Sequence, residues 1–410
     1  DFTDGSMNDK TFTLTVNVYA DGKVVTSEEQ NSYSNASIKS VSVDNTELTK
    51  VENKDYQYET TLPEGTTSTT LDIETENKYA SVTVEKIDSL AYSDTTSNIK
   101  RLSTKKTLDL KSGDNYFKVT VTSENKETIN EYKIKISVIE SVSIFGKQYS
   151  VIQKAPTLTA TSDASGDESG LYKSTDTNSG NPTYYFRGNV ENNYVSFAGQ
   201  IWRIVRINED GTIRIIMKNG INNNKIYKFN SNYDNYTYMY YSNSEVKTTL
   251  ENWYQANIGS NQSLVSNVVR GNYFCEEAKV KFSSSWTSGN ATMVLPSDYL
   301  PSFKCEADAN GKGVVNASVG LLTYDEAIYA GGYCGQNNKN YYLFNNSTLL
   351  TMSPAGVASG RSSVWYMHNY GSINYYYVND SDRLRPTLNL TAGTKISTGT
   401  GTSSDPFVVE

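Results

Sequence analysis

Residues 110–137 read LKSGDNYFKVTVTSENKETINEYKIKIS, and this stretch decides the fold class of the first third of the chain. Apolar and polar residues alternate in YFKVTVTSE and again in EYKIKISV, and Ser112-Gly113-Asp114 supplies a turn before the first of them. Alternation with a period of two is typical of β-strands that bury one face. The strands expected between residues 37 and 138 are IKSVSV, YQYETTL, STTLDIET, ASVTVE, KTLDL, YFKVTVTSE and EYKIKISV. Short strands at this spacing, with almost no helical periodicity, predict a β-sandwich of about 100 residues.

Two segments flank this predicted sandwich. In residues 1–36, TFTLTVNVYADGKVVTS alternates around an Asp21-Gly22 turn, which predicts a β-hairpin or the remnant of a domain begun upstream. Residues 139–168 are expected to be a linker, because KAPTLTATSDASGDESG is rich in Ser, Thr, Asp and Gly. The preceding ESVSIFGKQYSVIQ has the pattern of one more hairpin.

The sandwich region resembles the cadherin-like β-sandwich family of bacterial surface proteins. The resemblance rests on IKSVSVDNTEL at residues 38–48, on Tyr56 with the alternating strand after it, and on residues 110–137. It implies an immunoglobulin/cadherin-like fold over about residues 37–138. Members of such families serve mainly as spacers, so the resemblance implies a stalk.

Beyond residue 168 the composition changes, because tryptophans, cysteines and two helix signals appear. VKTTLENWYQANI has Val246, Leu250, Trp253 and Ile258 at helical spacing. LLTYDEAIYAGG carries an N-cap Thr323 with Glu326 three residues later, which is the pattern of a capping box. The strands expected around these helices are NYVSFAG, IWRIVRI, TIRIIMK, YYLFN and LRPTLNL. Residues 169–410 are therefore expected to form an α+β domain, and the whole chain to be mostly β.

Two features of this domain have a structural interpretation. IWRIVRI is apolar on both faces, so it predicts a central strand covered on both sides, whose arginines bind loop carbonyls or carboxylates. Pro386 limits LRPTLNL to an edge strand or a strand start.

Four motifs in this domain resemble a family of Firmicute extracellular domains of unassigned biochemistry. They are YYFRGNVENNYVSFAGQIWRIVRINEDGTIRIIM, SVGLLTYDEAIYAGG, LLTMSPAG and DRLRPTLNL. The layout is similar to a C-type-lectin-type fold, and the resemblance covers about residues 170–409. It implies a ligand-binding domain of the kind found at the tips of surface proteins or pilin-like chains.

Residues 362–382, SSVWYMHNYGSINYYYVNDSD, have the composition of a recognition surface. Tyr and Trp give large, stiff contact area, while Asn and Ser supply adaptable hydrogen bonds. Alternation places Tyr366 and Trp365 on opposite faces, so one face is expected to meet solvent or a partner. Residues 227–245 have similar content and are expected to form a second loop of the same surface. The predicted ligand-binding residues are Tyr366, His368, Asn369, Tyr370, Asn374, Tyr375, Tyr377, Asn379 and Asp380.

The three cysteines allow a disulfide, a metal site or a reactive thiol. Cys275 and Cys305 stand in similar contexts, and the polar, Thr- and Asn-rich composition looks extracellular, so a structural Cys275–Cys305 disulfide is expected. Cys334 would then be a free thiol or pair with a partner outside this chain. No CxxC spacing exists and His368 is the only histidine, so neither a metal site nor a cofactor is expected.

Enzyme activity is not expected. Asp325 and Glu326 are adjacent, so on a helix their side chains diverge by about 100°, and Glu326 already has a capping role. The DANGKG stretch at residues 308–313 lacks the later carboxylates of a calcium-binding EF-hand and is expected to be a turn.

Composition also restricts the partners. A net charge of −8 argues against a nucleic-acid partner. The sequence contains no run of 18 apolar residues, so no membrane span is expected. We therefore expect a secreted or surface-displayed bacterial binding protein, adhesin-like, that recognises a glycan or a host or neighbouring-cell protein. Two alternatives remain open: a pilin-like tip subunit that docks to other surface subunits, and an extracellular glycoside hydrolase.

Overall fold

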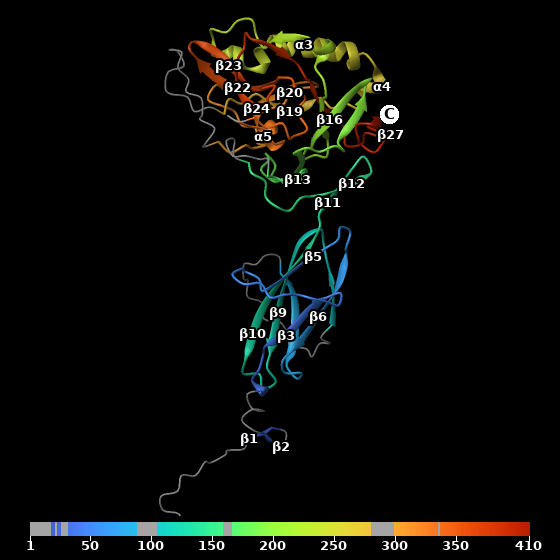
Figure 1. Ribbon diagram of the computed structural model, residues 1–410, viewed down its shortest axis with the longest axis vertical. Coiled ribbons are helices and arrows are strands. Elements are labelled where there is room, and N and C mark those ends of the chain that lie inside the picture. Colours follow the sequence, from blue (N-terminus) through green and yellow to red (C-terminus); the bar gives the residue numbers. More distant parts are fainter. Residues whose placement is uncertain are drawn as a thin grey trace, which may run out of the picture. The chain divides into compact units, whose positions relative to one another are not determined.

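The computed structural model describes residues 18–20, 23–25, 32–87, 105–158, 166–279, 299–334 and 337–410. The chain divides into two compact units, Asp1–Ser141 and Val142–Glu410. The described part of both units consists mostly of β-strands with a few short helices, which confirms the predicted fold class at this level (Figure 1).

At the start of the described chain lies a short hairpin. β1 (Val18–Ala20) pairs antiparallel with β2 (Lys23–Val25), around the predicted Asp21-Gly22 turn. The turn itself, and the predicted strand residues before Val18, lie outside the described residues.

Two four-stranded sheets, in the orders β5-β10-β9-β7 and β4-β3-β6-β8, make up the rest of the first unit. β10 pairs parallel with β5 and antiparallel with β9. The strands are β3 (Ile38–Val43), β4 (Thr46–Glu47), β5 (Tyr58–Leu62), β6 (Ser68–Thr75), β7 (Ser81–Ile87), β8 (Lys105–Asp109), β9 (Gly113–Thr122) and β10 (Ile129–Val138). Each of the seven predicted strands is present, and β4 is an addition.

The core of this sandwich follows directly from the alternation in its strands. Val41 and Ile73 from one sheet and Val119 and Ile134 from the other are completely buried members of a single apolar cluster. Inward-facing side chains repeat every second residue, so two facing sheets bury one set each. Burial of each such side chain contributes about 1.5–3 kcal/mol to stability.

The second unit begins with a hairpin in the segment that the sequence assigns to a linker. β11 (Ser141–Ile144) pairs with β12 (Lys147–Ser150), as ESVSIFGKQYSVIQ suggests. Ile144 and Tyr149 are buried in the core of the second unit. The boundary between the compact units therefore lies at residues 141/142, before most of the 139–168 segment.

An eight-stranded sheet forms the body of the second unit, in the order β13-β14-β16-β15-β28-β27, with β17 beside β16 and β26 beside β17. β16 and β17 are buried on both faces, and Trp202 and Arg214 are completely buried. β26 starts directly after Pro386, so it is a strand start, which is one of the two places predicted for it. Among the named strands it pairs with β17, and on its other side isolated bridges join Thr387 to Gly320 and Leu390 to Val268. The strands are β13 (Gly170–Ser174), β14 (Thr183–Arg187), β15 (Tyr194–Phe197), β16 (Gln200–Ile207), β17 (Ile213–Met217), β26 (Thr387–Leu390), β27 (Ile396–Thr398) and β28 (Phe407–Val409).

Buried arginines join this sheet to loops, and Arg203 confirms the role predicted for the arginines of IWRIVRI. Arg203 donates to Asn193 Oδ1 at 2.7 Å and to the Val190 carbonyl at 2.6 Å. Arg385 donates to the carbonyls of Met217 at 2.8 Å and Leu343 at 2.7 Å.

The strand predicted for YYLFN was wrong, because residues 341–345 form a bend and a turn. The carbonyls of Tyr342 and Leu343 accept hydrogen bonds from Arg203 and Arg385. These carbonyl groups therefore bind guanidinium groups and do not pair with a neighbouring strand.

Both predicted helices are present. α3 (Glu245–Tyr254) starts at Ser244, whose hydroxyl accepts from the Lys247 N–H, and it continues into a π-helical turn, η4 (Gln255–Gly259). α5 (Tyr324–Tyr329) has the predicted capping box between Thr323 and Glu326. In the described part of the second unit, the remaining helical segments are α2 (Ile221–Asn224), η2 (Tyr236–Met239), η3 (Tyr241–Asn243) and α4 (Gln262–Val265).

A second sheet, in the order β21-β24-β23-β22, carries the aromatic segment, and Figure 1 shows it on the side of the unit away from β27 and the C-terminus. Its strands are β21 (Tyr333–Cys334), β22 (Leu349–Ala358), β23 (Arg361–Met367) and β24 (Ser372–Tyr377). Two short pairs complete the unit: β18 (Ile226–Lys228) with β25 (Ser381–Arg383), and β19 (Gly271–Cys275) with β20 (Val314–Ala317).

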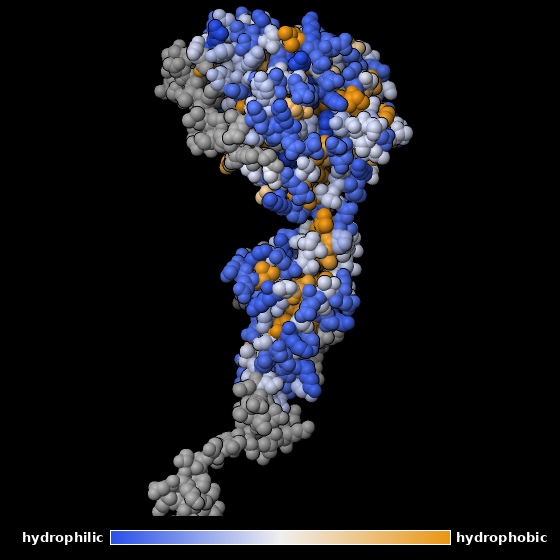
Figure 2. All heavy atoms as spheres, in the orientation of Figure 1, coloured by the Kyte–Doolittle hydropathy of each residue, from blue (hydrophilic) through white to orange (hydrophobic). Residues whose placement is uncertain are grey.

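Within the described part of the chain, no helix combines the length and apolar character needed to cross a membrane. The face of the molecule in Figure 2 is largely hydrophilic, with apolar residues scattered over it.

Candidate functional site

The candidate binding site lies on the β23–β24 hairpin. The strands pair antiparallel, with Tyr366 opposite Asn374 and Trp365 opposite Tyr375. Residues that lie opposite each other share a face of the sheet, and neighbours along a strand point to opposite faces. The predicted cluster is therefore divided between two faces of one hairpin.

One face carries a row of four aromatic rings. The Tyr366 ring lies 4.7 Å from Tyr376 and 5.8 Å from His368, measured between ring centroids. His368 in turn stacks on Tyr370 at 4.4 Å with an angle of 22° between the planes. Tyr366 is 7% exposed and Tyr370 is 52% exposed, so the row runs from the core to the surface. Burial raises the pKa of the Tyr366 hydroxyl to about 12, so this tyrosine is neutral at physiological pH.

The opposite face is covered by α5 at one end and half-buried at the other. Trp365 stacks on Tyr324 of α5, with ring centroids 4.4 Å apart. Tyr375 and Tyr377 are half-buried and meet edge to face at 6.2 Å. Tyr375 also packs against the apolar core of the unit.

The second predicted loop, residues 227–245, reaches this hairpin at the start of β23. The N–H of Ser362 donates to the Tyr233 carbonyl at 2.8 Å. The guanidinium group of Arg361 lies 5.3 Å from the centroid of the Tyr233 ring and 5.2 Å from that of Tyr377. The loop therefore joins the Tyr377 side of the hairpin and not the row that ends at Tyr370.

The nine predicted ligand-binding residues differ in how far they are buried. Tyr370, Asn369 and Asn374 are exposed, His368 is half-buried between its ring partners, and Tyr375, Tyr377, Asn379 and Asp380 are half-buried. Tyr366 is buried, so it supports the row and offers little surface. One face of this segment was expected to meet solvent or a partner, and only its end at Tyr370 does so, because Val364, Trp365, Tyr366 and Met367 are all buried.

A disulfide joins Cys275 to Cys305, the pair that the sequence predicts, with 5.8 Å between their Cα atoms. It ties the end of β19 to the segment before β20. Asn178 fixes the same segment from the other side, because its amide bonds both the N–H and the carbonyl of Cys305, at 2.8 and 3.1 Å. The Cys334 side chain lies outside the described residues.

Metal ligands are scarce in the described part of the chain. The one group of three potential ligands there is Cys275, Glu277 and Cys305, and both sulfur atoms belong to the disulfide. Residues 308–313 form the predicted turn, in which the N–H of Gly311 donates to the Asp308 carbonyl at 2.9 Å. The Asp308 carboxylate accepts protein donors, among them the Tyr240 hydroxyl at 2.7 Å.

A cleft of about 410 Å³ lies beside the disulfide, and it was not predicted from the sequence. At its floor, the Glu326 carboxylate contacts Arg206 at 3.2 Å and Arg214 at 2.5 Å through the same oxygen. Burial raises the pKa of Glu326, but the two neighbouring guanidinium groups lower it by more, so the net shift is downward. Burial and the charge of Arg206 lower the pKa of Arg214 to about 10, although Glu326 opposes this shift.

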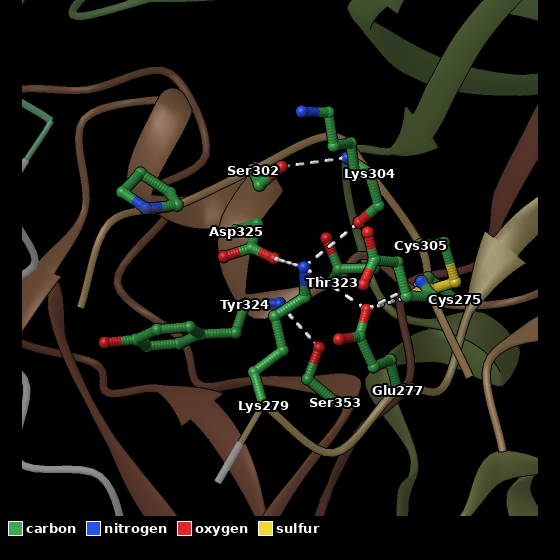
Figure 3. Close-up of polar contacts among 12 residues, drawn as sticks. Cys275, Glu277, Lys279, Ser302, Lys304, Cys305, Thr323, Tyr324, Asp325 and Ser353 are labelled. Atoms are coloured by element: carbon green, nitrogen blue, oxygen red, sulfur yellow. Dashed lines mark hydrogen bonds and ion pairs between the residues drawn. A yellow bond between two sulfur atoms is a disulfide. The ribbon is translucent and has the colours of Figure 1, made fainter. Parts of the chain in front are cut away.

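Asp325, the neighbour of Glu326, belongs to a different network (Figure 3). It accepts a hydrogen bond from the Tyr299 hydroxyl and lies 3.5 Å from Lys279 Nζ, which also contacts Glu277 at 3.3 Å. Burial raises the pKa of Asp325 to about 6. A carboxyl group with such a pKa is typical of a general acid, but a glycosidase needs a second carboxylate free to act. Glu326 is not free, since it already binds two arginines and the N–H of Thr323.

A family model matches a segment of the first unit. Residues 4–138 match the family described as a cadherin-like beta sandwich domain. The match starts before the β1–β2 hairpin, so it is longer at its N-terminal end than the predicted sandwich of residues 37–138. No curated protein matches the chain.

Proposed function

We propose that this chain is an extracellular, surface-displayed bacterial binding protein of the adhesin type. In this proposal the cadherin-like sandwich is a stalk, the second unit has a C-type-lectin-type fold, and the end of the β23–β24 hairpin binds the ligand without catalysis. The observation that carries it is the half-exposed Tyr370 ring, which stacks on His368 at the outer end of a row anchored in the core.

The row presents one exposed ring, that of Tyr370, and does not form a flat platform of several rings. Its rings stand 4.4–5.8 Å apart, so they cover much of one another. Tyr370 is the last ring in the row, its neighbour in the chain Asn369 is exposed, and so is Asn374, which lies opposite Tyr366 on the same face of the hairpin. A ring fixed in advance loses little conformational entropy on binding, which favours affinity.

We favour a glycan as the ligand. A single open aromatic surface suits one sugar ring, whose C–H face packs on the tyrosine while its hydroxyl groups bond the amides of the two asparagines. A protein ligand would use the same residues as an aromatic anchor with a polar rim.

The disulfide supports an extracellular location. Disulfides persist in oxidising compartments and are rare in the cytosol. Cys275 and Cys305 are both only half-buried, so a reducing environment would have access to them.

The test is a comparison of the full chain with its Tyr370→Ala variant on a glycan array and in pull-downs with surface proteins. We expect a discrete set of glycans to bind the unchanged protein, and the variant to lose that binding at an unchanged melting temperature. Capture of a surface protein, with no glycan bound on the array, would mean that the ligand is a protein and not a glycan. Equal binding by both proteins would refute the proposed site.

A further inference from the structure

The cleft beside the disulfide lies between the β16–β17 turn and residues 302–305. We propose that it is a second binding site, for an acidic monosaccharide with one carboxylate, and that Arg206 binds this carboxylate. The volume of about 410 Å³ lies within the range of small-molecule sites. This site is separate from the hairpin and does not depend on the function proposed for it.

The Arg206 side chain is held in place, but not all of its N–H donors are used. Its Nε donates to Glu326 at 3.2 Å and its Nη1 donates to the Thr183 hydroxyl at a long 3.4 Å. Nη2 has no hydrogen-bond partner among the residues that the structure describes. The Cζ atom of Arg206 lies 4.8 Å from the centroid of the Phe303 ring, and Arg206 is only 9% exposed. A planar, pre-positioned guanidinium group with free donors is suited to a carboxylate.

The charges next to Arg206 also favour an anion at that place, although the lining of the cleft as a whole has more carboxylates than cations. Arg206 and Arg214 share the single carboxylate of Glu326, so these three buried groups carry one positive charge in excess. Buried charges in proteins are normally paired, and a ligand carboxylate beside Arg206 would supply the missing partner.

The other carboxylates at the cleft limit what the ligand can be. Asp210 accepts from the Tyr273 hydroxyl and from Thr212, and Glu209 accepts from Ser179 through one oxygen only. These acceptors, together with Asp325, would repel a polyanion. They favour a ligand whose remaining groups are hydrogen-bond donors. Sugar hydroxyl groups are such donors. A ligand with one carboxylate and several hydroxyls therefore fits both Arg206 and the acceptors of Asp210, Glu209 and Asp325.

The wall of the cleft is fixed from several directions, which suits a preformed site. The disulfide holds Cys305, and Asn178 holds its backbone. The ammonium group of Lys279 donates to the Lys304 carbonyl at 3.0 Å, and Figure 3 shows it at the centre of this contact network. A preformed site binds without the cost of ordering its wall.

The experiment is calorimetric titration of the full chain with D-galacturonate, D-galactose and L-glutamate. We expect D-galacturonate to bind and its neutral counterpart to bind at least about tenfold more weakly, because the carboxylate interaction is charge-assisted. Arg206→Lys keeps the charge beside Glu326 but loses the planar fork, and should weaken D-galacturonate binding about tenfold. Tyr370→Ala should leave it unchanged, since that residue belongs to the hairpin.

A second variant avoids the buried arginine altogether. Asn272 is exposed and lines the cleft, so Asn272→Asp adds a negative charge at its wall and should weaken binding several-fold. Asn252→Asp on α3, outside the cleft lining, is the matched control and should bind like the unchanged protein. Equal binding of D-galactose, binding of L-glutamate alone, no binding of D-galacturonate, or unchanged affinity in Asn272→Asp would each overturn the proposal.

Discussion

Tyr366 and Tyr375 lie on opposite faces of the β23–β24 hairpin, because Tyr366 is opposite Asn374 and Tyr375 is opposite Trp365. One of them anchors the ring row that ends at Tyr370, and the other packs with Tyr377 and the core. A dense aromatic segment thus contains one set of rings that support the fold and a smaller set that meets solvent.

Truncation of Tyr366 and of Tyr370 should therefore have different effects. Tyr366→Ala removes a ring that is 7% exposed and should lower the free energy of unfolding by about 3–5 kcal/mol. Tyr370→Ala should change it by less than about 1 kcal/mol, since that ring is 52% exposed. Urea denaturation of both variants measures the difference, and similar losses in the two would contradict this division of the row.

The disulfide should stabilise the second unit. Cys275 and Cys305 close a loop over a sequence separation of 30 residues, so Cys275→Ser with Cys305→Ser should lower the free energy of unfolding by about 2–4 kcal/mol. The unchanged protein in a reducing agent should show the same loss. Two free thiols at these positions in protein made under oxidising conditions, found by mass spectrometry, would exclude the bond.

Asp325 should make stability depend on pH. Its pKa in the folded protein is about 6, above the ordinary 3.8, so the folded state binds the proton more tightly. The contribution of this group is therefore fully present below about pH 4 and is lost as pH rises through 6. Asp325→Asn removes the titration. The stability of the unchanged protein relative to this variant should fall by roughly 1–3 kcal/mol between pH 4 and pH 7.

Urea denaturation at several pH values measures the free energy of unfolding of the unchanged protein and of Asp325→Asn, and the difference between the two is followed with pH. Glu326, whose pKa is shifted the other way, is present in both proteins, so its contribution cancels. Parallel stability profiles for the two proteins would mean that Asp325 titrates normally.

The β11–β12 hairpin should be part of the second unit and not of a linker. A fragment of residues 142–410 keeps Ile144, Tyr149 and Val151, which are buried in the core of that unit, whereas a fragment of residues 154–410 lacks them. We expect the shorter fragment to melt at a clearly lower temperature, because it loses three buried side chains that contribute about 1.5–3 kcal/mol each. Equal melting temperatures would place the start of the unit after residue 153.

Strands with one buried face could be predicted from the sequence, and β6 (STTLDIET) matches its predicted segment residue for residue. The burial of β23 could not, because tyrosine is suited to both a core and a surface. Val364-Trp365-Tyr366-Met367 is apolar on both faces, which is also the pattern of the doubly covered β16, but the tyrosines around it favoured the surface interpretation.

The cleft was missed for a different reason. Glu326 was predicted from a local signal, the capping box with Thr323, and that prediction was confirmed. Its second role, as the counter-charge beside the cleft, depends on Arg206, which is 120 residues away in the sequence. No local pattern encodes such a pairing, although the arginines of two neighbouring apolar strands require a buried counter-charge somewhere in the fold.

The most direct test of the account is the affinity of two double variants of the full chain for the ligand that the array identifies. Tyr370→Ala with Asn374→Ala removes the exposed ring of the row and an exposed asparagine on the same face, and Tyr375→Ala with Tyr377→Ala removes rings from the opposite face of the same hairpin. We predict that the first pair weakens binding at least about a hundredfold, while the second stays within a few-fold of the unchanged protein. Loss of binding only in the second pair, with both variants folded, would place the ligand on the Tyr377 face and contradict the site proposed for this protein.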